Sequence, residues 1–217
     1  MAELMMFAHL LVLVYWLGGD LGAFYASSIL VDEKQPAPAR MAAAKVVANV
    51  DMAPRMALIF AFPTGYSLAI SIGWLAAPGW TAGLAWGGAL AWAVLAWMLH
   101  LKKGPQDLFK QFDLIIRFAA IAGLVLGAVA ALTGMIDAPV FLALKWLILG
   151  AAIVCGLIIR AGLAPFFPAI GALAAGRAGD EENALIRSAL GRVKVFVLII
   201  WGLVISAALL GVYTPDF

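Results

Sequence analysis

Four ionisable side chains stand out because they interrupt otherwise apolar stretches of the sequence. His9 and Asp20 lie in the first stretch, His100 closes the third, and Lys145 lies in the fifth. An ionisable group inside a membrane is costly, so each of these residues is a candidate functional residue. An imidazole can bind a metal ion, while a carboxyl group or an amine can bind a proton or a charged ligand.

His9 has two sulfur-containing neighbours on its own helix. Met5 and Met6 lie four and three residues before His9, so the three side chains can share one helix face. Thioether and imidazole groups are donors that suit Cu(I), and Met135 ends the fourth stretch at the same predicted level. The same methionines also fit as flexible gap-filling or lipid-facing side chains. Both interpretations stay open at this point.

Helix rise indicates which of these groups can meet. His9 and Lys145 each lie a few residues from an outer end, at depths of roughly 8 Å and roughly 9 Å. His100 falls at the opposite end of its stretch, roughly 20 Å away, which disfavours one heme held by both histidines. Lys145 either extends its amine outward to water or pairs with an anionic ligand group such as a heme propionate.

Asp20 follows His9 by three helical turns and lies on nearly the same face, with Trp16 between them. By the same count of helix rise, it matches the depth of Thr64 in the second stretch. We therefore expect the Asp20 carboxyl group to hydrogen-bond to Thr64, Tyr66 or Ser67. A proton-handling role for Asp20 is the alternative.

The elements that carry these residues are predicted to be transmembrane helices. Hydrophobic residues make up 65% of the 217 residues and charged residues 12%, whereas a soluble domain has roughly 25% charged residues. Stretches of about 20 apolar residues cross a bilayer. The sequence predicts an all-α, six-helix membrane bundle forming one domain over residues 1–217, with spans near 4–30, 54–76, 82–101, 114–136, 139–163 and 193–213.

The connections between these spans differ in charge and in predicted structure. Of the 14 lysines and arginines, all but Lys145 fall in or beside alternate connections, Lys102 and Lys103 among them. The positive-inside rule then predicts cytoplasmic basic loops and both termini outside. Two basic connections are expected to hold short interfacial helices, over Pro38–Val50 and Asp180–Arg192. Pro165 and Pro168 are expected to end the fifth span.

Three segments resemble a known family of membrane proteins. The segment HLLVLVYWLGG, with His9, Trp16 and a glycine pair, resembles the first helix shared by CopD-type copper-resistance proteins and HemJ-type protoporphyrinogen oxidases. FLALKWLILGAAIVCGLIIRAGLAP resembles a CopD helix built around a lysine, and IRSALGRVKVFVLIIWGLVISAALLGVYTP is similar to that family's last helix. The HemJ-type lysine lies in an earlier span, where this sequence reads LAWGGALAW.

The resemblance implies heme b binding through His9 and Lys145, with Trp16 near the cofactor and a quinone or porphyrin as partner. The resemblance to CopD-type proteins implies that copper crosses the membrane through this protein, with Met5, Met6 and His9 as its ligands at the entrance. A non-catalytic subunit of a larger membrane complex, or a homo-oligomer, is the third hypothesis. A net charge of +2 gives no basic excess for binding nucleic acid. Enzymatic activity is left open.

Overall fold

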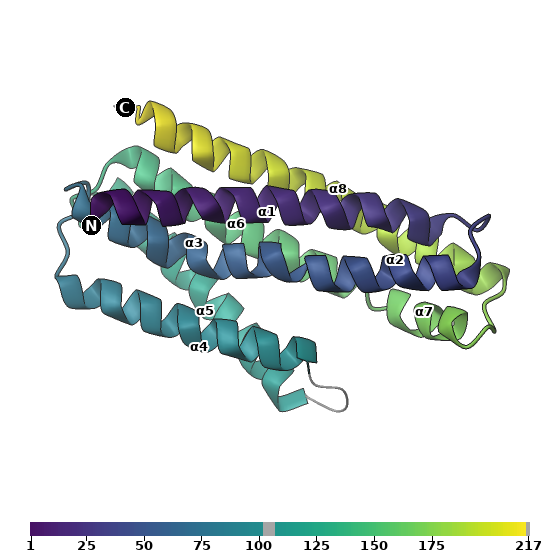
Figure 1. Cartoon of the computed structure of the whole chain (residues 1–217). Helices are drawn as coiled ribbons and strands as arrows, with labels where there is room; N and C mark the ends of the chain where they lie inside the picture. Colours follow the sequence, from purple (N-terminus) through teal and green to yellow (C-terminus); the bar gives the residue numbers. More distant parts are fainter. Residues whose placement is uncertain (102–106, 216–217) are drawn as a thin grey trace. The chain divides into compact units, whose positions relative to one another are not determined.

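The computed structural model describes residues 1–101 and 107–215, and Lys102 and Lys103 of the predicted basic loop lie outside these residues. The described part of the chain is all-helical, with no strand (Figure 1). Its helices are α1 (Ala2–Val31), α2 (Ala37–Val50), α3 (Met52–Ser71), α4 (Gly79–Leu101), α5 (Asp107–Leu132), α6 (Val140–Gly162), α7 (Phe166–Ala174) and α8 (Asp180–Tyr213).

The six predicted membrane helices are confirmed. Within the part of the chain that the structure describes, six helical segments are long and apolar enough to cross a membrane, and α2 and α3 together count as one of them, Ala37–Ser71. Many large apolar side chains of α1, α4 and α8 are exposed, as expected of helices that contact lipid. The chain is therefore a helical membrane protein. The orientation of its loops and termini stays a prediction.

Two boundaries differ from the prediction in ways that affect the candidate sites. α5 begins at Asp107 rather than near Leu114, so Asp113 and Arg117 lie well inside the helix. The expected separate helix Asp180–Arg192 is wrong, because α8 runs without a break from Asp180 to Tyr213. Its buried side chains Ile186, Ala189, Leu190 and Val193 follow helical spacing, so packing continues across the expected boundary.

The region after α6 holds a helix that was not predicted. α6 ends at Gly162, before Pro165, as expected. Pro165 then caps the short helix α7, and Pro168 occupies the first turn of that helix. A proline is tolerated in a first turn because the amide hydrogen that it lacks would have no helical acceptor there. The two prolines therefore separate two helices rather than begin a loop.

The chain divides into two compact units, and α1 contributes to both. Unit 1 comprises Met1–Val14, Met56–Ile153 and Leu203–Phe217. Its core joins α3, α5 and α6, and a second cluster joins α3 and α4 around Trp92. Alanines are frequent in both clusters, which lets the helices approach closely. Unit 1 contains His9, Lys145 and Asp113.

Unit 2 comprises Tyr15–Arg55 and Val154–Gly202. Its core takes side chains from α1, α2, α7 and α8, with Leu30 and Ile186 fully buried. Arg40 of α2 is buried with them, and its Nε donates a hydrogen bond to the Leu30 carbonyl oxygen at 2.9 Å. This contact satisfies a carbonyl at the end of α1 that has no partner within the helix. One domain over residues 1–217 stays a prediction.

Candidate cofactor site around His9

The His9 imidazole is held by a hydroxyl group of the neighbouring helix α3. Its Nδ1 lies 2.9 Å from Oγ1 of Thr64, a side chain that is 2% exposed. The same Thr64 oxygen lies 2.6 Å from the carbonyl oxygen of Phe60, one turn earlier in α3. Thr64 therefore fixes the position of an imidazole that would otherwise rotate freely about its side-chain bonds.

These two contacts assign the proton of the imidazole. A threonine hydroxyl has one hydrogen to donate, and a carbonyl oxygen can only accept a hydrogen bond. Thr64 therefore donates to Phe60 and accepts from His9, so Nδ1 of the neutral imidazole carries the hydrogen. Nε2 then keeps its lone pair, and no hydrogen-bond partner occupies it among the described residues. A histidine that donates through one ring nitrogen and offers the other is the usual arrangement of a metal ligand.

Gly65 makes room for this imidazole. A Cβ atom at position 65 would lie 2.9 Å from Cε1 of His9, closer than real side chains approach each other. Only glycine lets the ring lie against α3 at this point. The sequence therefore supplies both the acceptor and the space for His9 in two consecutive residues, Thr64 and Gly65.

Lys145 of α6 is the second ionisable group of the site. Lys145 and His9 both belong to unit 1. Nζ of Lys145 would lie 2.7 Å from a Cβ at position 211, so Gly211 of α8 makes room for the amine. No carboxylate pairs with Lys145 within the described residues. The site thus combines an imidazole and an amine without an acid to neutralise them.

The other predicted ligands do not form a comparable set. Met5 is half-buried, Met6 is 49% exposed and Met135 is 81% exposed. Trp16 is buried in unit 2, whereas His9 belongs to unit 1. No group of three or more histidine, cysteine, aspartate or glutamate side chains is arranged to hold a metal ion within residues 1–101 and 107–215.

The hydrogen bond expected between Asp20 and the second span joins residues of the two different units, and it stays a prediction. The three candidate partners of Asp20 form hydrogen bonds within unit 1. Thr64 bonds to His9, Tyr66 lies 2.9 Å from the Thr81 hydroxyl, and Ser67 accepts from Trp86. Counting helix rise matched the depths of Asp20 and Thr64, but it did not specify the direction in which either side chain points.

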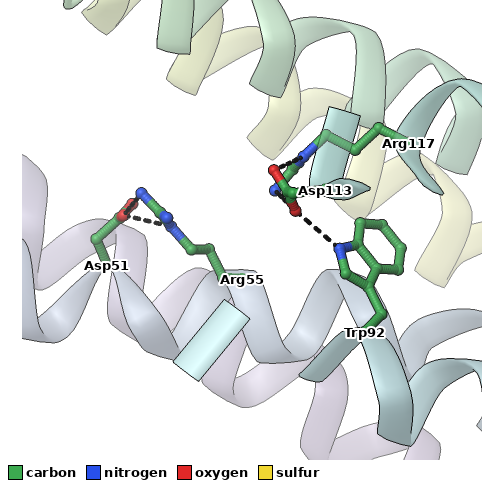
Figure 2. A network of polar contacts seen from close by, with 5 residues as sticks. All are labelled: Asp51, Arg55, Trp92, Asp113 and Arg117. Carbon is green, nitrogen blue, oxygen red and sulfur yellow. Dashed lines mark hydrogen bonds and ion pairs between the residues drawn. The ribbon is translucent and has the colours of Figure 1, made fainter. Parts of the chain in front are cut away.

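A buried ion pair within α5, which Trp92 of α4 contacts, was not anticipated. Asp113, 2% exposed, accepts hydrogen bonds from Nε of Arg117 at 3.0 Å and from the indole N–H of Trp92 at 3.0 Å (Figure 2). The guanidinium carbon of Arg117 also lies 5.5 Å from the centre of the Trp92 ring. The spacing of four residues between Asp113 and Arg117 was a signal for this pair, but the predicted span begins at residue 114, between the two residues.

Comparison of the chain with family models, with curated proteins and with solved structures finds no match. The resemblance to the CopD and HemJ types therefore stays a prediction.

Proposed function

We propose that this chain is an integral membrane protein that binds heme b through Nε2 of His9 and takes part in electron transfer. The supporting observation is the hydrogen-bond chain from His9 through Thr64 to the Phe60 carbonyl oxygen, which leaves Nε2 unprotonated. An unprotonated imidazole nitrogen is a standard axial ligand of heme iron. Bound heme would supply one-electron redox chemistry at this position.

Lys145 is the second residue on which the proposal rests. An amine without a carboxylate partner suits an anionic group of the ligand, and heme carries two propionates that meet this description. His9 would hold the iron, and Lys145 would bind and orient one propionate. An apolar redox partner such as a quinone or a porphyrin would reach the site from the lipid. The proposed location is a bacterial inner membrane, with the basic loops in the cytoplasm.

Heme titration of the purified protein in detergent tests the role of His9. We expect the wild type to develop a Soret band, His9→Ala to lose it and His100→Ala to keep it. Thr64→Val removes the acceptor of the Nδ1 hydrogen and should weaken heme binding about 10- to 100-fold, whereas Thr64→Ser should not. A Soret band of equal strength in the wild type and His9→Ala would refute the assignment.

A second titration tests Lys145 with heme dimethyl ester, which lacks the two carboxylates. The wild type should bind heme more tightly than the ester. Lys145→Met, which removes the amine but keeps an apolar stem, should bind the two compounds equally. A preference for heme that survives in Lys145→Met would exclude the amine as the propionate partner.

Cu(I) is the alternative ligand, because the free Nε2 and the thioether of Met5 one turn earlier would both accept it. Metal analysis of the purified protein distinguishes the two cases. Copper that is lost when Met5, Met6 and His9 are replaced together, in a protein without a Soret band, would favour copper handling. Absence of both ligands, together with a stoichiometric protein partner, would favour a structural subunit.

A further inference from the structure

Unit 1 contains the turns of two helical hairpins, α3–α4 and α5–α6, and the two turns share one motif. The first turn reads GWLAAP from Gly73 to Pro78, and the second reads GMIDAP from Gly134 to Pro139. Both glycines adopt the left-handed conformation, with φ angles of 80° and 74°. A glycine in this conformation ends a helix with little strain, because it has no side chain to clash with the backbone.

The backbone hydrogen bonds of the two turns also correspond. In the first turn the amide of Trp74 donates to the Ala69 carbonyl oxygen at 2.9 Å. In the second turn the amide of Met135 donates to the Ala130 carbonyl oxygen at 2.8 Å. Both bonds join the residue after the glycine to the last turn of the preceding helix, as in a Schellman motif. Trp74 and Met135 therefore occupy equivalent positions in the two hairpins.

The first hairpin packs against the second through one of these positions. The Trp74 ring meets the Phe141 ring edge to face, with 4.9 Å between the ring centres and 84° between the ring planes. Phe141 is the second residue of α6 and is 2% exposed. Both side chains belong to the core cluster that joins α3, α5 and α6. The end of α3 is thus fixed to the start of α6.

The two positions that correspond to this contact are both uncovered. Met135 takes the place of Trp74 in the second hairpin and is 81% exposed. Trp80 takes the place of Phe141 in the first hairpin, as the second residue of α4, and is 67% exposed. One chain therefore carries both halves of a second contact of this kind, and the two halves do not cover each other.

We propose that copies of this chain join through these two positions, so that Met135 of one copy packs on the Trp80 ring of the next. A thioether against an aromatic ring is a favourable contact. Trp80 and Met135 each lie beside a hairpin turn, and the contact between Trp74 and Phe141 shows that both turns lie at one end of unit 1. Copies that share one orientation in the membrane therefore bring the two side chains to the same depth.

The surface of α4 beside Trp80 leaves room for a neighbouring helix. Gly83 and Gly87 follow Trp80 at helical spacing and are exposed, and a Cβ on either would meet nothing within 4 Å. Small residues at such positions let membrane helices approach closely. The occupant is a second copy because this chain already joins its two hairpins by the equivalent contact. Since the interface joins two different patches, it is head-to-tail and can close into a ring. It is separate from the proposed heme function.

Disulfide cross-linking between single-cysteine variants tests the proposal. The background is Cys155→Ala, which removes the only cysteine of the chain. Full-length Trp80→Cys and Met135→Cys are co-expressed with two different affinity tags and oxidised in membranes before solubilisation. Both positions are exposed, so these variants should fold. The pair Trp97→Cys and Met135→Cys is the matched control, because Trp97 is also exposed on α4 but lies near the opposite end of that helix.

We expect the pair Trp80→Cys and Met135→Cys to give a cross-linked dimer that carries both tags, several-fold more than the control pair gives. A chain with both substitutions should form a ladder of cross-linked oligomers, because each copy then offers both halves of the contact. A mixed dimer no more abundant than in the control would overturn the proposal. Equally strong cross-linking of either variant with itself would also overturn it, because the contact would then be symmetric.

Discussion

Removing the carboxylate of Asp113 should destabilise unit 1 more than any exposed charge does. The Asp113 side chain is 3% exposed and that of Arg117 is 12% exposed, so both charges are largely removed from solvent. Asp113→Ala leaves the guanidinium beside the Trp92 ring without this counter-ion. Breaking a buried ion pair from one side typically costs about 3–5 kcal/mol of unfolding free energy. We expect Asp113→Ala to fall in this range.

Two further variants show how much of this unfolding free energy comes from the hydrogen bond of Trp92 and how much from the ion pair. Trp92→Phe removes the N–H that donates to Asp113 and should cost about 1.5–3 kcal/mol, the range for hydrogen bonds to charged groups. The double variant Asp113→Leu/Arg117→Met replaces the pair by apolar side chains and should cost less than Asp113→Ala. The difference between the cost of this double variant and the summed costs of Asp113→Leu and Arg117→Met measures the coupling of the two charges.

Denaturant titration in mixed micelles, followed by tryptophan fluorescence, gives the unfolding free energy of each variant. Asp107→Ala is the matched control, because the Asp107–Lys110 pair lies in the same helix with side chains 82% and 52% exposed. Exposed pairs contribute about 0–1 kcal/mol. The reasoning fails if Asp113→Ala and Asp107→Ala cost the same, or if the double variant costs as much as Asp113→Ala or more.

Two glycine substitutions test the close approaches of helices. Gly19→Ala places a Cβ 2.6 Å from a proline ring atom and should destabilise the protein by about 1–3 kcal/mol. Gly18→Ala meets nothing within 4 Å and should be neutral or stabilising by up to about 1 kcal/mol in thermal unfolding; equal effects would contradict the packing. Gly65→Ala should displace the imidazole of His9 and reduce the Soret band, while Gly88→Ala, with open space around it, should not. An unchanged Soret band in Gly65→Ala would remove the role assigned to this glycine.

The hydropathy of the sequence places the start of the fourth span later than the start of α5, and the reason is physical. A sliding average treats Asp113 as an unfavourable residue, so the predicted span begins directly after it, at residue 114. In the structure Asp113 and Arg117 neutralise each other one helical turn apart and share the Trp92 side chain, so they pack inside unit 1. Their i, i+4 spacing indicates a possible pair, but burial depends on how α4 packs against α5.

The amino-acid sequence alone determined that this chain enters a membrane as six apolar helices, because no other solvent accommodates so apolar a surface. It also singled out His9, Asp20 and Lys145, since ionisable groups are rare and costly in such helices. Only the tertiary structure decided their partners. Helix rise fixes the depth of a residue but not the direction of its side chain, so Thr64 was matched to Asp20 although it binds His9. That direction, set by the packing of α1 on α3, leaves Nε2 of His9 free for a ligand.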